Sequence, residues 1–471
     1  MTDEDSILEN IRYSNEKILI LNVFSCACLP AIFNGGNSTI GLCVIFAAGI
    51  LAIINVCTFP SNWIDAPEFT RVKYFAALSP YLAVLAFSIF RLSNPATAEF
   101  LEGEHVYIKF SELSGLCASS AYNDSYGAVS GCIALVSSAA AALSIPFITQ
   151  SRFVLKKMIA LCAIFISLLC AGGFIVEFFE SISAHSIKWL FGRNAFSTFE
   201  YAPSFSTTSY IWGSMLLAAG IYTKQRFRLL SAVITPRSLF LFGGALMFAA
   251  AFFTAKDSFK PFIVAGGAIA SAIYAIDTIP TLYNLKRHWD YDFYGEMPKR
   301  KITEVVFPII FYSLVSVACV AFLAANFSDI ASAFSDSPAL AGINDDTRKI
   351  IEQKPLFGWG VNSFPTVFKF FQGDDIEFAN WISPTTDVYR MLVDVGYAGI
   401  AALLITPAFM LIKTLAGIAF KVSYSGIIML SAVLFVAISA NFSNTLQNPA
   451  AMASFMVLFF TFIAWEDAEI I

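Results

Sequence analysis

Residues 354–364 read Lys-Pro-Leu-Phe-Gly-Trp-Gly-Val-Asn-Ser-Phe, and they lie inside a polar stretch, 326–390, near the C-terminal end of the chain. Nearly all of the sequence around this stretch is apolar. The polar stretch returns to apolar sequence at residues 388–399, which read Val-Tyr-Arg-Met-Leu-Val-Asp-Val-Gly-Tyr-Ala-Gly. Because a long polar loop interrupts an otherwise apolar chain, we expect the chemistry of the protein to take place there.

The composition around this loop is that of a membrane protein. Apolar residues make up 57% of the 471 residues and charged residues 13%, and the mean hydropathy is +0.70. A soluble domain has roughly 45–50% apolar and about 25% charged residues. Apolar runs of about 20 residues, the length that crosses a hydrocarbon core, recur along the chain. We therefore expect an all-α polytopic membrane protein.

The apolar runs predict twelve transmembrane helices in three regions. Residues 1–325 form a nine-helix region, 326–390 the large loop with short helices, and 391–471 a three-helix region. The expected spans are 17–33, 38–59, 73–91, 128–148, 157–178, 208–222, 238–254, 261–281, 303–325, 391–412, 425–441 and 450–465.

Charge in the short loops predicts the orientation of these spans. Short cytoplasmic loops accumulate Lys and Arg, and the basic clusters at 152–157, 224–228 and 286–301 share one side of the predicted topology. Both termini are then cytoplasmic. The three longer loops, near 92–127, 179–207 and 326–390, face the periplasm of a bacterial inner membrane.

Motifs for several kinds of chemistry are missing from the sequence. There is no CxxC or HExxH pattern, no phosphate-binding glycine loop and no dinucleotide fingerprint. Most cysteines lie in apolar spans, where they are typical small buried hydrophobes. We expect no metal, no cofactor and no nucleic-acid partner.

The large loop has a predicted local structure. Asn344 is a candidate N-cap for a short helix that runs to Gln353. Pro355 ends this helix, and Gly358 and Gly360 allow the chain to turn sharply. The Phe and Val side chains of 361–371, with Trp359 before them, predict an amphipathic patch that rests on the membrane surface.

These two segments resemble the O-antigen ligase/polymerase superfamily, integral membrane glycosyltransferases that use glycans carried on undecaprenyl diphosphate. Members show the pattern Pro-Leu-x-Gly-x-Gly-x-x-x-Phe, which residues 355–364 follow through Pro355, Gly358 and Gly360. They return to the membrane through His-Asn, an acidic residue and Gly-x-x-Gly; the re-entry matches are Asp394, Gly396 and Gly399. The resemblance covers about 340–412 and is only topological elsewhere.

The chain departs from this family at three places. Thr385 and Thr386 stand where the family has His-Asn, and Arg348 lies closer to the turn than the family's arginine. The family also has a Thr-x-Ser-Arg signature that opens a mid-chain span, and residues 254–258 resemble it. In this chain Asp257 occupies the arginine position, and Lys256 is the nearest cation. The missing histidine favours polymerisation over ligation to lipid A core.

The resemblance implies transfer of a glycan from undecaprenyl diphosphate to an acceptor saccharide on the periplasmic side, as in O-antigen, capsule or exopolysaccharide synthesis. The departing diphosphate needs cations, and the fork of arginine binds phosphate oxygens with two hydrogen bonds. The candidate diphosphate-binding residues are Arg193, Arg348, Arg390 and Lys256. Arg390 is also spaced for a structural ion pair with Asp394, and Arg91 is interpreted as an interfacial anchor.

A general base must accept the proton of the acceptor hydroxyl. Asp387 is the first candidate, because it lies two residues from the vacant histidine position and next to the diphosphate-binding residues, which we call the clamp. The alternative is that Asp387 is an ordinary solvated loop carboxylate. His185 or His105 could replace the missing histidine from another loop, and Asp374 and Asp375 could bind sugar hydroxyls.

Two other classes of protein fit the topology. Secondary transporters and lipid flippases share a twelve-span layout with both termini inside, but they usually have two similar halves and polar or broken helices near the midplane. A non-catalytic assembly partner is the other alternative. Besides the lipid bilayer and the lipid-linked saccharides, a chain-length regulator is a possible partner that the sequence does not reveal.

Overall fold

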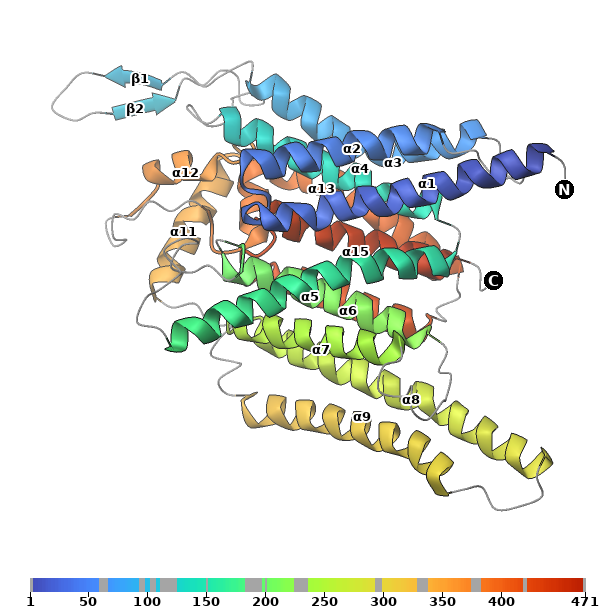
Figure 1. The fold of residues 1–471 in the computed structure, drawn as a ribbon. Coiled ribbons are helices and arrows are strands. Elements are labelled where there is room, and N and C mark those ends of the chain that lie inside the picture. Colours follow the sequence, from blue (N-terminus) through green and yellow to red (C-terminus); the bar gives the residue numbers. More distant parts are fainter. Residues whose placement is uncertain are drawn as a thin grey trace.

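A computed structural model of the chain describes residues 3–58, 67–92, 98–101, 107–110, 125–149, 151–182, 197–199, 201–223, 236–292, 299–327, 338–373, 383–417 and 422–468. Within these ranges the structure is a bundle of long helices (Figure 1). The first nine are α1 (Asp3–Ala27), α2 (Thr39–Thr58), α3 (Pro67–Leu92), α4 (Ser125–Ile148), α5 (Arg152–Ile182), α6 (Ala202–Ile221), α7 (Pro236–Thr254), α8 (Lys260–Asp292) and α9 (Lys299–Ala325). The last three are α13 (Asp387–Gly417), α14 (Tyr424–Ser439) and α15 (Pro449–Asp467).

Ten of these helices are long and apolar enough to cross a membrane, which is typical of a membrane-embedded protein. The two others are α14, which has 16 residues, and α6, which is rich in Ser and Thr. They occupy the places of the predicted spans 425–441 and 208–222. Each of the twelve predicted spans therefore overlaps a helix, but several bounds differ. Helix α13 begins at Asp387, four residues before its predicted start, α8 continues to Asp292, and the predicted span 17–33 runs past the end of α1 at Ala27.

The centre of the bundle is α6, because every residue from Ser204 to Gly220 is buried. Three of its hydroxyl groups, those of Ser206, Thr207 and Thr208, donate to nearby backbone carbonyls, whereas the buried Ser204 hydroxyl has no partner. Thr208 donates to the Ser204 carbonyl at 2.9 Å, and Ser206 donates to the Ala251 carbonyl of α7 at 2.7 Å. In contrast, α9 lies at the edge of the bundle against α8, with no buried residue in its apolar span (Figure 1).

The two ends of the bundle differ (Figure 1). The N-terminus and the C-terminus lie at the same end, which we call the terminal end. The opposite end, the loop end, carries a two-stranded ribbon and the short helices of the large loop. The short helices of the large loop are α11 (Pro338–Gln353), α12 (Phe364–Val367) and η4 (Phe368–Phe370). Two more short helices, η1 (Leu29–Ile32) and η2 (Asn34–Gly36), connect α1 to α2.

The ribbon corrects the all-α prediction for one loop. Strand β1 (Ala98–Leu101) pairs antiparallel with β2 (Tyr107–Phe110), with Ala98 opposite Phe110. Both strands lie in the predicted loop 92–127. The membrane part of the prediction is unaffected, because the ribbon lies outside the helices.

The large loop shares a small hydrophobic core with the start of α13, which corrects the prediction of a membrane-resting aromatic patch. Trp359, Phe364 and Phe368 are at most 4% exposed, and they pack with Ile343 and Ile350 of α11. The Trp359 indole donates to the Ile350 carbonyl at 2.8 Å. Helix α11 also begins at Pro338, earlier than the predicted N-cap at Asn344, because Ile343 and Ile350 place an apolar face over this core.

Candidate functional site

The turn at 355–360 and the re-entry segment at 393–398 form one structural unit. Helix α13 is broken at Gly396, where φ is 67° and ψ is −176°. Around the break the two segments exchange four backbone hydrogen bonds. They run from Trp359 N–H to the Val393 carbonyl (2.6 Å), Gly360 to Asp394 (2.9 Å), Tyr397 to Pro355 (2.9 Å) and Ala398 to Leu356 (2.9 Å). The turn therefore satisfies backbone groups that the helix break exposes.

Glycine is required on both sides of this contact. Gly358 and Gly396 have φ of 62° and 67°, and Gly360 has φ of 113°, a region that L side chains rarely adopt. A Cβ on Gly358 would lie 2.5 Å from the Val393 carbonyl oxygen. In Gly399, a Cβ would lie 2.5 Å from the Cβ of Val395. The glycines of the two sequence motifs are thus used for close packing of the turn and of α13.

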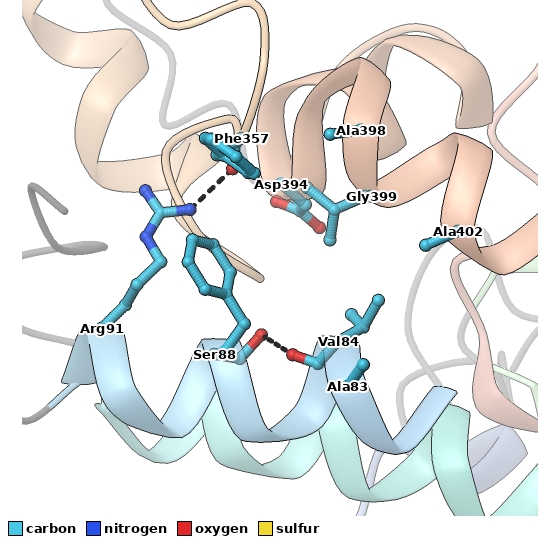
Figure 2. Close-up of a pocket in the computed structure, with 11 residues that line it drawn as sticks. Ala83, Val84, Ser88, Arg91, Phe357, Asp394, Ala398, Gly399 and Ala402 are labelled. Carbon is cyan, nitrogen blue, oxygen red and sulfur yellow. Dashed lines mark hydrogen bonds between the residues drawn. The ribbon is translucent and has the colours of Figure 1, made fainter. Parts of the chain in front are cut away.

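Arg91 at the end of α3 fastens the same turn. It is 3% exposed and donates to the Phe357 carbonyl at 2.6 Å (Figure 2). It also donates to the Gly358 carbonyl at 2.8 Å. Its guanidinium also lies 5.5 Å from the ring centroid of Phe87. The interpretation of Arg91 as an interfacial anchor is therefore wrong, since the side chain is buried and links α3 to the large loop.

Arg390 and Asp394 face each other one turn apart on α13. The Arg390 Nε lies 3.6 Å from Asp394 Oδ2, with side-chain exposures of 21% and 9%. This confirms the predicted i, i+4 ion pair. The contact is long for a charge-assisted hydrogen bond, and Arg390 is partly open to solvent. The arrangement leaves Arg390 accessible to a further anion.

Asp387 is not a solvated loop carboxylate. It is 5% exposed, and its Oδ2 accepts hydrogen bonds from the backbone N–H groups of Thr445 (2.8 Å) and Leu446 (2.9 Å). The Asp387 N–H donates in turn to the Ser443 carbonyl at 3.1 Å. Asp387 therefore fixes the start of α13 to the α14–α15 connection.

The structure brings two of the candidate diphosphate-binding residues to this carboxylate and keeps a third apart. Lys256, half-buried between α7 and α8, lies close enough to Asp387 to interact electrostatically with it, as does Arg390. Arg348 instead has a 60% exposed side chain on α11, where it contacts Asp345 at 3.2 Å and the Tyr389 hydroxyl at 3.1 Å. Arg193, His185, His105, Asp374 and Asp375 lie outside the described residues.

A cavity of about 190 Å³ lies between α3 and α13 directly below the turn. Residues 83–91 of α3 and 394–402 of α13 line it, and Phe357 closes it at the loop end. Figure 2 shows the Asp394 carboxylate pointing into the space between the two helices, with Arg91 at one end. Among the carboxylates of the candidate site, Asp394 is the one that lines this cavity.

Lys354 is a further charged residue at the site, and sequence reasoning did not identify it as a functional residue. Its Nζ lies 4.1 Å from the Trp359 ring centroid. Burial and, secondly, the neighbouring Arg91 charge lower the pKa of Lys354 to about 8. By contrast, the pKa of Lys349 is raised by its hydrogen bond to Asp346 (2.8 Å). In the described part of the chain, no group of three His, Cys, Asp or Glu side chains is placed to hold a metal ion.

No protein-family model matches the chain, and comparison with curated proteins gives no match.

Proposed function

We propose that the protein is a polymerase-type membrane glycosyltransferase that extends a surface polysaccharide from a lipid diphosphate donor. The observation that carries this proposal is the joining of the two motifs that resemble the O-antigen ligase/polymerase superfamily. The turn at 355–360 is bonded to the break in α13, directly beside Arg390 and Asp394. A ligase that transfers the glycan to lipid A core is the alternative within the same superfamily.

The charges at this junction support a role in diphosphate binding. Arg390 is partly exposed, and Lys256 lies near the same carboxylate, Asp387. As the bond between sugar and diphosphate breaks, negative charge grows on the leaving group, and two nearby cations stabilise it. We assign Arg390 as the main clamp residue because its planar fork can make two hydrogen bonds to phosphate. Lys256 adds a point charge.

The carboxylates divide between two roles in this proposal. Asp387 is held by two backbone N–H groups, so its role is to position the start of α13 beside the α14–α15 connection. Asp394 also interacts with Arg390 and with the backbone of Asn362 and Ser363, but it points into the cavity and is therefore the better placed candidate for accepting the proton of an acceptor hydroxyl. The new glycosidic bond then forms between that oxygen and the anomeric carbon, and the diphosphate leaves with the bonding electron pair.

The proposal places the loop end in the periplasm of a bacterial inner membrane and both termini in the cytoplasm. Asp345 offers a test, since its side chain on α11 is 64% exposed. In a background without Cys117, a cysteine placed by Asp345→Cys reacts with an impermeant maleimide in intact spheroplasts if this orientation holds. Labelling only after permeabilisation contradicts it.

Deletion of the gene, followed by gel analysis of surface polysaccharide and its lipid-linked intermediates, tests the function. Accumulation of single repeat units, or their appearance alone on the acceptor, supports a polymerase. Accumulation of long lipid-linked chains supports the ligase alternative. Normal polysaccharide with normal intermediates rules out both.

A further inference from the structure

The cavity between α3 and α13 is lined mainly by apolar residues, and four small ones lie in its part farther from the turn. Ala83 of α3 faces Ala398, Gly399 and Ala402 of α13 across it (Figure 2). Small residues on both helices leave space that larger side chains would fill, and this space extends along α13 beyond Asp394, for about two helical turns. We call this part of the cavity the slot.

The slot opens toward the surface of the bundle that lipid would cover. Ala83 is exposed, and the neighbouring side chains Leu82 and Leu404 are 38% and 55% exposed. Both α3 and α13 belong to the helices that are long and apolar enough to span a membrane. A hydrocarbon chain in the bilayer therefore reaches the slot sideways, without crossing water.

The loop end of the slot is positively charged. Arg91 lines it, Lys354 interacts electrostatically with Arg91, and Arg390 pairs with Asp394, which also lines the cavity. Three cations, Arg91, Lys354 and Arg390, thus lie near the Asp394 carboxylate at this end, and the second carboxylate, Asp387, also lies near Arg390. A slot that is apolar along its length and cationic at one end is complementary to a lipid with an anionic headgroup.

We propose that the slot holds the isoprenoid chain of the lipid diphosphate donor, with the diphosphate at the Arg390 end. This inference rests on the proposed function, since it identifies where the donor's lipid part binds. A methyl-branched isoprenoid is thicker than a straight acyl chain. Small residues on both walls, at Ala83 and at Ala402, leave room for the branches.

Substitutions that fill the slot test the proposal. Ala402→Phe and Ala83→Phe place a ring in the slot, whereas Leu404→Phe and Leu82→Phe add a ring on exposed positions of the same two helices. The probe is farnesyl diphosphate carrying a benzophenone, photolysed with the purified full-length protein and quantified by intact-protein mass spectrometry. We expect the two slot variants to lose about tenfold in cross-linking, the equivalent of about two buried methylene groups. The two surface variants are expected to behave as the wild type.

Two outcomes overturn the slot as the donor site. One is equal cross-linking of farnesyl diphosphate by slot and surface variants that elute as monodisperse protein. The other is that the slot variants lose cross-linking to a benzophenone-bearing phosphatidylglycerol but keep cross-linking to the farnesyl probe. That result makes the slot a phospholipid site.

A second measurement avoids filling the slot. Ala83→Cys, labelled with an environment-sensitive fluorophore, should change its emission when farnesyl diphosphate is added, and an unchanged emission contradicts the proposal. These readouts need no glycosyl transfer. If the wild type makes polymer but farnesyl diphosphate does not bind in the slot, only the slot proposal is rejected. If farnesyl diphosphate binds in the slot but the wild type makes no polymer, only the proposed function is rejected.

Discussion

Gly358, on the turn, packs directly against Gly396, at the break of α13. A Cβ on Gly396 would lie 2.5 Å from the backbone nitrogen of Gly358, and a Cβ on Gly358 would lie 2.8 Å from that of Gly396. Two segments that are nearly forty residues apart in the sequence are therefore mutually dependent. This contact sets the position of the large loop on the membrane helices.

The first prediction follows from that contact. Gly396→Ala and Gly358→Ala should each destabilise the protein by more than the roughly 1–3 kcal/mol of backbone strain, because backbone atoms must also move apart. The apparent midpoint of thermal unfolding in detergent, measured at one scan rate, reports the loss. Gly417→Ala in the same helix is the control, since nothing lies within 4 Å of a Cβ there. Equal midpoints for Gly396→Ala and Gly417→Ala would refute the packing role.

Arg91 gives the second prediction. Arg91→Met removes the donors to the Phe357 and Gly358 carbonyls and should cost about 3 kcal/mol or more, at roughly 1.5–3 kcal/mol per hydrogen bond to a charged group. It should also expose the large loop to limited proteolysis. Arg348→Met, at a side chain that is 60% exposed, should change stability by about 1 kcal/mol or less. If both variants resist protease as the wild type does, Arg91 does not fasten the loop.

Sequence patterns were sufficient for the membrane helices and for the two motifs, because apolar runs and glycine spacing depend on local chemistry. They could not show that Gly358 packs on Gly396, since a contact between distant segments leaves no local signal. Arg91 was misinterpreted for the same reason: a cation at the end of a span has the same sequence context whether it contacts water or two carbonyls. The aromatic patch was also misplaced, because the partners of Trp359 and Phe364 lie on α11.

The third prediction separates the two carboxylates. Asp394→Asn removes the charge that pairs with Arg390 at some cost in stability, but the protein should still fold, and glycosyl transfer should fall by about 10²–10⁴-fold, the usual contribution of a general base. Asp387→Asn weakens the acceptor for the Thr445 and Leu446 N–H groups, so it should lower thermal stability instead. Comparison of unfolding midpoint and turnover for both variants decides the assignment. A stable, inactive Asp387→Asn beside an active Asp394→Asn would return the base to Asp387.

The fourth prediction concerns the pKa of about 8 for Lys354. An unfolded Lys has a pKa of about 10.4, so between these values the unfolded state binds more protons than the folded state. The contribution of Lys354 to stability should therefore rise with pH across this window and be absent in Lys354→Met.

Competitive acetylation followed by mass spectrometry checks the pKa directly. Lys354 should become reactive with a midpoint near 8, whereas Lys349, whose pKa is raised, should react only at higher pH. Identical pH profiles for the two lysines would contradict the effect of burial.

Reconstitution of the purified protein tests the central claim most directly. Vesicles that contain only this protein and an undecaprenyl-diphosphate-linked repeat unit should accumulate longer lipid-linked glycans. Arg390→Ala should abolish this extension at normal protein levels, and Arg390→Lys should restore it only in part, because lysine keeps the charge and loses the fork. Extension by Arg390→Ala at the wild-type rate would contradict the clamp. Absence of any extension by the wild type, with the lipid-linked donor intact or merely moved between leaflets, would contradict the assignment as a glycosyltransferase.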